Sequence, residues 1–213
     1  FCFYHKNPKQ ATFMGTLIYI FAGWTIYAAM KHPYFSNPMI YLPLVLMGID
    51  KIYKKEKPWL FIWATVISAM SNFYFFYMIC IFMFIYAAFR YFGIFSKRSV
   101  KDVFDWLVKF IGYYAVALMI AAVIFLPVIM TLFGTDRFQA ENYVPLLYDK
   151  IYYEKYLGNL IGENMIQWGV AGYSAVAMAG VFVLFSKKKK YLDLKWGFVL
   201  LNLFLLVPFA GHV

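Results

Sequence analysis

Residues 113–132 read YYAVALMIAAVIFLPVIMTL, an uninterrupted stretch without a charged side chain. An α-helix needs roughly 20 apolar residues to cross the hydrocarbon core of a bilayer, and this stretch has that length and composition. It is apolar on every face, as is Tyr74–Phe89, whereas the strands of a membrane barrel alternate between apolar and polar residues. The pattern therefore predicts an all-α fold within a membrane.

The whole chain has the composition of a membrane protein. Of its 213 residues, 64% are hydrophobic and only 14% are charged, and the mean hydropathy is +0.66. Soluble domains contain about 25% charged residues, so water is a poor solvent for this chain. The two cysteines, Cys2 and Cys80, and the three histidines follow no spacing that is typical of disulfides or metal sites.

Seven apolar segments predict a polytopic integral membrane protein, with about seven transmembrane or partly spanning helices in a single region, residues 1–213. The segments are Ala11–Met30, Pro38–Ile49, Pro58–Met70, Phe73–Tyr91, Phe104–Leu132, Gly169–Phe185 and Leu194–Ala210. The second and third segments are short, and at 1.5 Å per residue they cover only about 20 Å. These two either reach the interfaces through flanking residues or line a cavity.

The positive charges predict an orientation for the helices. Lys and Arg number 20 against 10 Asp and Glu, but they lie in short clusters between apolar segments, which argues against nucleic-acid binding. If every segment crosses the bilayer, sixteen basic residues fall on one side and four on the other. Because cytoplasmic loops are rich in Lys and Arg, we expect residues 1–10 in the cytoplasm and the loop at about 131–168 outside.

The outer loop, residues 131–168, is the longest polar stretch and holds half of the acidic residues. Within it, Tyr148, Tyr152 and Tyr156 recur every four residues. A helix would carry these rings on one face and would lie on the outer membrane surface. The rings either anchor this interfacial helix at headgroup depth or stack on a sugar.

Candidate binding residues lie in the outward loops, because no Asp, Glu, Lys or Arg is near the middle of an apolar segment. Arg137 can form paired hydrogen bonds to a lipid phosphate, and its neighbour Asp136 can accept a proton or bind a divalent cation. Alternatively, these two residues form a local ion pair or an interfacial anchor.

Two further outward connections carry polar candidates. The stiff connection from His32 to Asn37 either holds a shape near the membrane face or is a plain exposed turn. At the next connection, Ser71, Asn72, Tyr74 and Tyr77 can offer hydroxyl and amide contacts to a substrate that arrives from the lipid. In the alternative interpretation, these residues only cap helices.

Several stretches of the chain resemble the YfhO family of bacterial membrane proteins, in the same order along the sequence. They are Gly15–Gly23, His32–Leu44, Gly48–Ile52, Ser71–Phe75, Tyr77–Ile79, Leu126–Val128 and Arg137. Beyond Arg137 the likeness rests on the hydropathy pattern alone. The family is similar to the GT-C glycosyltransferases, which implies a GT-C-like fold in the bacterial plasma membrane.

The resemblance implies an enzyme of Gram-positive bacteria that takes a sugar from a polyprenyl-phosphate carrier. It would transfer this sugar to a cell-wall polymer, such as teichoic acid, on the outer face. It also implies a longer chain whose catalytic acidic residue precedes Phe1, so residues 1–213 receive no catalytic assignment. The alternatives are a flippase or transporter of the lipid carrier and a non-catalytic membrane scaffold.

The binding residues that carry over by this resemblance come from three outward loops. Arg137 matches the need for a guanidinium at a lipid-linked phosphate, and Asp136 is a weaker match for a metal or acceptor contact. The remaining positions are His32, Asn37, Asn72 and Tyr74.

Overall fold

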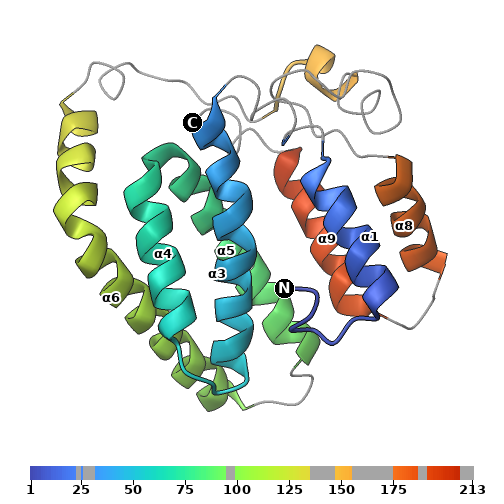
Figure 1. Cartoon of the computed structure of the whole chain (residues 1–213), viewed down its shortest axis with the longest axis horizontal. Coiled ribbons are helices and arrows are strands. Elements are labelled where there is room, and N and C mark those ends of the chain that lie inside the picture. The colour runs from blue at the N-terminus through green and yellow to red at the C-terminus, as the bar shows by residue number, and fades with distance from the viewer. Residues whose placement is uncertain are drawn as a thin grey trace. The chain divides into compact units, whose positions relative to one another are not determined.

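A computed structural model describes residues 1–22, 25, 32–94, 99–134, 147–154, 175–186 and 191–206. Every regular element in these ranges is helical, which confirms the all-α prediction (Figure 1). The elements are α1 (Lys9–Ile20), the 3-10 helix η1 (Pro33–Ser36), α3 (Asn37–Tyr53), α4 (Trp59–Ser71), α5 (Phe73–Ile94), α6 (Val100–Phe133), α8 (Ala175–Ser186) and α9 (Leu192–Leu205).

The chain divides into two compact units, each considered by itself. The first unit contains Phe1, Phe3–His5 and Ser36–Glu141, and the second contains Cys2, Lys6–Phe35 and Asn142–Val213. The helices α3 to α6 therefore belong to the first unit, whereas α1, α8 and α9 belong to the second.

Charge is distributed unevenly along the first unit. Figure 1 shows that α3 and α5 run one way and α4 and α6 the other, so that helix ends meet at two opposite ends of the unit. The end at which α3 and α5 finish and α4 and α6 begin is here called the basic end. Residues 58–89 and 110–134 carry no charge, so the opposite end, here called the neutral end, has no charged side chain among the described residues.

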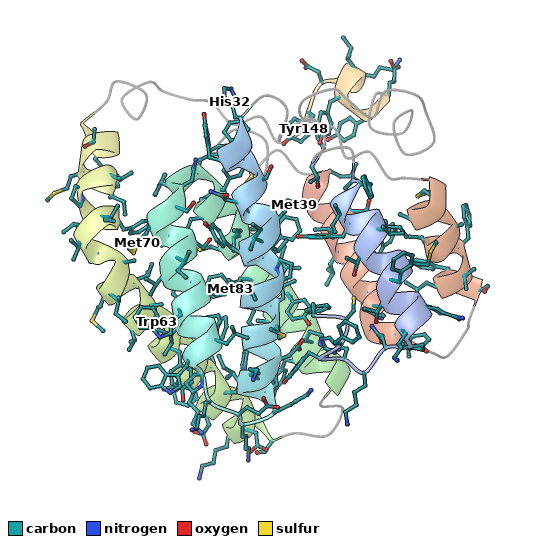
Figure 2. All side chains as sticks on the ribbon, in the orientation of Figure 1. His32, Met39, Trp63, Met70, Met83 and Tyr148 are labelled. Carbon is teal, nitrogen blue, oxygen red and sulfur yellow. The ribbon has the colours of Figure 1, made fainter. Side chains whose placement is uncertain are left out.

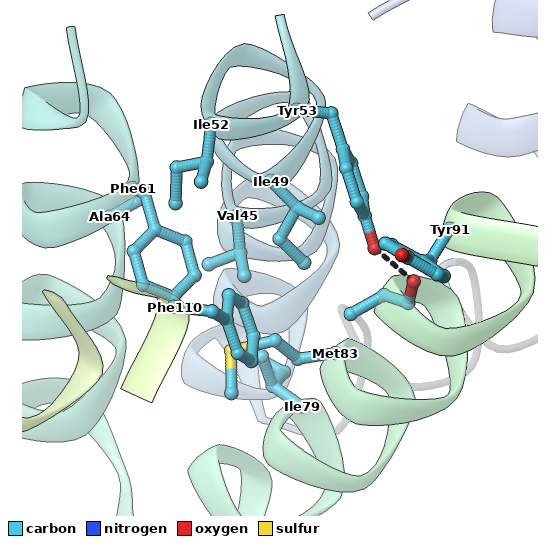
Figure 3. Packing of buried hydrophobic residues seen from close by; sticks show 11 residues of the cluster. Val45, Ile49, Ile52, Tyr53, Phe61, Ala64, Ile79, Met83, Tyr91 and Phe110 are labelled. Carbon is cyan, nitrogen blue, oxygen red and sulfur yellow. Dashed lines mark hydrogen bonds between the residues drawn. The ribbon is translucent and has the colours of Figure 1, made fainter. Parts of the chain in front are cut away.

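The core of the first unit lies between α3, α4, α5 and α6. Val45 and Ile49 of α3 are buried with Phe61 of α4, Met83 of α5 and Phe110 of α6, and these side chains point toward one another in Figure 3. A second buried cluster joins Ile62, Val66 and Ala69 of α4 to α6. There the small residues Ala117 and Ala121 let the two helices approach closely, as is common in membranes.

The helices α3 and α4 approach each other closely at Gly48 of α3. A Cβ atom built on this residue would lie 2.6 Å from Cα of Phe61 and 2.8 Å from its N. A side chain at position 48 would therefore collide with the backbone of α4, where no rotamer change can relieve the contact. Glycine at this position sets how closely α3 and α4 pack.

One helix among the described residues is both long and apolar enough to cross a bilayer, within Lys101–Thr131 of α6. Its 34 residues extend over about 51 Å, more than a hydrocarbon core of about 30 Å requires. Its outward face, including Met119 and Val123, is apolar and exposed, which suits contact with lipid tails. The other described apolar helices are shorter: Trp59–Ser71, Phe73–Ala88, Ala177–Ser186 and Leu194–Leu203.

The helix boundaries refine the predicted segments. The segment Pro38–Ile49 is one turn too short, because α3 continues to Tyr53. The segment Pro58–Met70 is matched within one residue by α4, which has 13 residues. The count of seven spans is not established, since long parts of the first and sixth segments lie outside the described residues.

The second unit contains part of the predicted outer loop. Residues 150–154 are helical, and Tyr148, which lies just before the helix, has its ring centroid 4.1 Å from that of Tyr152. Tyr153 was not expected to contribute, yet its hydroxyl donates to the carbonyl of Leu206 at 3.1 Å. Tyr156 lies outside the described residues, and the position of this helix on the membrane surface stays a prediction.

We expect Gly48→Ala to destabilise the protein, because the new methyl group forces α3 and α4 apart. The free energy of unfolding should fall by about 1–3 kcal/mol, measured by titrating the purified full-length protein with sodium dodecyl sulfate in mixed micelles. Gly112→Ala on α6 is the matched control, since nothing lies within 4 Å of a Cβ atom there. Equal losses for both variants would contradict the packing account.

Candidate functional site

The neutral end of the first unit brings together three of the residues that the sequence singled out. Asn37 begins α3, Asn72 joins α4 to α5, and Tyr74 lies in the first turn of α5. The Nδ2 group of Asn37 donates to Oγ of Ser71 at 3.5 Å, linking the start of α3 to the end of α4. A small hollow beside this contact, without room for a water molecule, is lined by Pro38, Tyr41, Ser68, Ser71, Asn72, Phe75 and Ile79.

Asn72 caps α5. Its Oδ1 atom accepts hydrogen bonds from the backbone N–H groups of Tyr74 at 3.0 Å and Phe75 at 3.4 Å, the pattern of an N-cap residue. The capping interpretation of this residue is therefore confirmed. Its Nδ2 group has no partner among the described residues, so this donor is not used by the cap, and Asn72 is one of the residues that line the hollow.

Two hydroxyl groups of α4 extend this polar region into the core. Ser68 is 2% exposed and lines the hollow, and Thr65 lies one turn deeper. Neither Ser68 Oγ nor Thr65 Oγ1 has a hydrogen-bond partner within the described part of the chain. A buried hydroxyl without a partner is costly, so both groups would gain from a polar ligand or a water molecule that reached them. Sequence analysis missed both residues, although with Ser71 they recur every three positions along one side of α4.

Of the other three predicted residues, one belongs to the second unit and two lie outside the described residues. His32 is exposed and belongs to the second unit, where its ring centroid lies 5.0 Å from that of Phe35. Asp136 and Arg137 lie outside the described residues. The structure thus brings together Asn37, Asn72 and Tyr74, and the roles given to the other three positions stay predictions.

At the basic end, a buried carboxylate joins three parts of the first unit. Asp50 of α3 is 1% exposed. Its Oδ2 atom accepts a hydrogen bond from the hydroxyl of Tyr86 at 2.6 Å, and its Oδ1 atom accepts one from Nε of Arg90 at 3.1 Å. His5 Nε2 lies 2.9 Å from Oδ2, but without the alignment of a hydrogen bond. These four residues are called the Asp50 cluster below.

The Asp50 cluster was absent from the sequence-based candidates because the second segment was ended at Ile49, which left Asp50 in a loop. In the structure the helix continues for another turn and turns this carboxylate into the protein. Tyr86 and Arg90 are four residues apart and therefore share a face of α5. The four-residue spacing of Tyr86 and Arg90, together with an acid at the end of an apolar segment, is the sequence signal that could have predicted this cluster.

The residues at the start of the chain add polar contacts at the basic end. The hydroxyl of Tyr4 donates to Oε1 of Glu56 at 3.2 Å, and Nζ of Lys54 lies 4.0 Å from the centre of the Tyr4 ring. Burial and the bond to Glu56 raise the pKa of Tyr4 to about 12, so its hydroxyl stays protonated. Burial also lowers the pKa of His5, although the neighbouring Asp50 opposes this effect. His5 is therefore neutral near pH 7.

Comparison with known proteins agrees with the pattern seen in the sequence. Residues 1–211 match the family described as bacterial membrane protein YfhO. Over 91 residues the chain is 34% identical to the "uncharacterized protein YfhO" of Bacillus subtilis (strain 168), a stretch covering 41% of this chain and 10% of that protein. The chain spans about a tenth of the length of this curated relative. No solved structure matches the chain.

We expect Asp50 and Arg90 to be strongly coupled. Asp50→Asn alone removes the negative charge beside the largely buried Arg90 and should cost about 3 kcal/mol, whereas the double variant Asp50→Asn/Arg90→Gln should cost clearly less than the sum of the single losses. The measurement is the unfolding titration in mixed micelles. Glu154→Gln, which breaks the exposed Lys150–Glu154 pair, should have no measurable effect. Additive losses for Asp50 and Arg90 would be inconsistent with a paired role.

Acidification should loosen the contact between His5 and the rest of the Asp50 cluster. The pKa of His5 is lowered in the folded state, so the stability that this residue contributes is present above its ordinary value of 6.5 and is lost as the pH falls through the lowered value. The groups that face His5 are Asp50, Tyr86, Arg90 and Lys54.

Hydrogen-exchange protection of residues 1–8, corrected for intrinsic rates, should therefore decrease between about pH 7 and pH 5. The matched variant His5→Gln, which does not titrate, should show little change over this range. A wild-type protein with constant protection would refute this prediction.

Proposed function

The chain belongs to the YfhO family of bacterial membrane proteins, and from this premise we propose that it forms part of a membrane-embedded glycosyltransferase with a GT-C-like fold. The enzyme takes a sugar from a polyprenyl-phosphate carrier and transfers it to a cell-wall polymer, such as teichoic acid, on the outer face of the plasma membrane. In this proposal the neutral end of the first unit faces outward and contributes to the site where the lipid-linked sugar binds.

The distribution of charge supports this orientation. Every charged side chain of residues 36–134 that the structure describes lies at the basic end, where Lys51 lies in the last turn of α3 and Lys54, Lys55 and Lys57 follow the helix. Basic loops stay on the cytoplasmic side of a membrane, so the neutral end would face the outside. A carrier-linked sugar that is presented on the outer face would then meet the neutral end.

The observation that carries the proposal is the set of uncharged polar groups without partners beside exposed tyrosines at the neutral end. Nδ2 of Asn72 and Oγ of Ser68 can bond to sugar hydroxyls, because an amide donates and a hydroxyl both donates and accepts. Tyr74 and Tyr77 are exposed close by and offer faces on which a sugar ring can stack. The hollow must widen to admit a sugar, which a shift of Tyr41 or Phe75 would allow.

The anionic part of the carrier needs cationic partners, and the described neutral end has none. We assign this role to Arg137, which follows α6 in the sequence, with Asp136 as a contact for a divalent cation or the acceptor. We keep His32 as a further proposed contact for the lipid-linked sugar, as the outward loop predicted from the sequence suggests. We assign no catalytic residue at the described neutral end, which holds no acid.

A flippase for the same lipid carrier is the alternative, and the buried hydroxyls of Thr65 and Ser68 are the observation in its favour. A flippase needs a polar path across the bilayer, and these two groups begin such a path from the neutral end. The path does not continue, because the core between them and the Asp50 cluster is made of side chains such as Val45, Ile49 and Phe61. Sugar transfer is therefore the better supported proposal.

Substitution of Asn72 separates its capping role from its binding role. Asn72→Ser keeps an oxygen that caps α5 but removes the Nδ2 donor, so we expect nearly unchanged stability and about tenfold less sugar on the wall polymer, the effect of one lost hydrogen bond. Asn72→Ala removes the cap as well and should also lower the free energy of unfolding by about 1 kcal/mol.

The assay expresses the full-length variants in cells that lack the wild-type copy and measures both membrane-inserted protein and sugar content of the wall polymer. Arg137→Ala, tested in parallel, should abolish glycosylation if this residue holds the carrier phosphate. Normal sugar content in both a well-inserted Asn72→Ser variant and a well-inserted Arg137→Ala variant would overturn the proposed site.

A further inference from the structure

The connection between α3 and α4 carries a dense group of lysines. Lys54, Lys55 and Lys57 are exposed in this short connection, and Lys55 adopts a left-handed backbone conformation with φ of 60°. Lys54 is held by Tyr4, since its Nζ atom lies 4.0 Å from the ring centre. Three ammonium groups are thus gathered at the basic end within four residues of sequence.

The one acid in this connection does not neutralise these lysines. Glu56 uses Oε1 to accept the hydrogen bond from Tyr4 at 3.2 Å, and its Oε2 atom lies 3.2 Å from Nζ of Lys51. Glu56 therefore compensates Lys51, which lies within α3. Among the residues that the structure describes, Lys54, Lys55 and Lys57 have no carboxylate partner. A net positive surface is left for an anion.

An apolar stripe begins directly beside these lysines and follows α4 toward the neutral end. Trp59 is 60% exposed and Trp63 is 52% exposed, and Ile67 and Met70 continue the exposed series. The spacings of four, four and three residues place all four side chains on one face of the helix. Figure 2 labels Trp63 and Met70 on the flank of α4. Tryptophan favours the interface between headgroups and tails, which is where the start of α4 would lie.

We propose that Lys54, Lys55 and Lys57, together with the stripe of Trp59, Trp63, Ile67 and Met70, form a binding site for an anionic phospholipid of the cytoplasmic leaflet. The ammonium groups bind the phosphate, the two tryptophans contact the glycerol region, and the acyl chains follow Ile67 and Met70. The combination of cationic head and apolar stripe fits a lipid, because a free phosphate or a nucleic acid has nothing to place on the stripe. The site depends on the orientation that the charges predict and not on the proposed glycosyltransferase activity.

The test uses the purified full-length protein in detergent, titrated with phosphatidylglycerol or phosphatidylcholine of the same acyl chains. Native mass spectrometry then measures the affinity of the first bound lipid. We expect a preference for phosphatidylglycerol of at least about tenfold, since each lysine near an anionic surface contributes severalfold. The preference should decrease in high salt, because the charges are exposed and are screened.

Three variants locate the site. Lys54→Gln/Lys55→Gln/Lys57→Gln should reduce the preference to about twofold or less, while Lys101→Gln/Lys109→Gln, which removes two exposed lysines of α6, should keep it. Trp59→Ala/Trp63→Ala should weaken the binding of both lipids alike. Glycerol phosphate, which carries the headgroup charge without acyl chains, should not compete.

Several results would overturn the proposal. The first is a wild-type protein that does not prefer phosphatidylglycerol, or whose preference persists in high salt. The second is a folded triple-lysine variant that keeps the preference. The third is an α6 control variant that loses the preference as fully as the triple-lysine variant does. Effective competition by glycerol phosphate would show that the site binds phosphate and not a lipid. If the triple variant does not fold, the salt dependence of the wild-type protein and the tryptophan variant still decide the question.

Discussion

Exclusion of charge from hydrocarbon is the constraint on which the first unit depends. A charged side chain at the centre of a bilayer costs several kcal/mol, and residues 58–89 and 110–134 contain none. The charges of α3 to α6 are consequently confined to one end, where carboxylates and cations can pair or meet water. The same constraint leaves the other end to neutral amides, hydroxyls and aromatic rings, which suit a sugar better than they suit an ion.

The two ends of the first unit are built differently. At the basic end, Asp50 is tied to Tyr86 and Arg90 in an arrangement that is costly to break. At the neutral end, Asn72 uses one side-chain atom to cap α5 and keeps another available, and Ser68 has no partner in the described chain. Close packing around Gly48 and Phe61 lies next to the basic end, and the core continues from there through Val45 and Met83. In the proposed enzyme, such packing would hold the outer groups in position while a substrate exchanges.

Sequence reasoning predicted the helices well and the depth of individual side chains poorly. The apolar segments appear as helices where the structure describes them, because an apolar run of helical length has few other stable states in a membrane. Asn72 was recognised as either a cap or a binding residue, and the structure shows the cap. Asp50 was overlooked because its burial depends on where α3 ends, and helix ends are the least certain part of a prediction. Ser68 and Thr65 were overlooked because a hydroxyl inside an apolar segment shows no sign of lacking a partner.

Amino-acid order alone was enough to establish an all-α membrane protein and its family, and it predicts an orientation. Hydrophobicity and charge are properties that each residue brings with it, and they can be summed along a chain without knowledge of its neighbours in space. The pairing of Asp50 with Arg90, 40 residues away in the sequence, and the approach of Asn37 to Ser71, 34 residues away, could not be obtained in this way. Such contacts depend on the rotation and register of one helix against another, which the close contact of Gly48 with Phe61 and the interlocking of side chains decide only in the folded molecule.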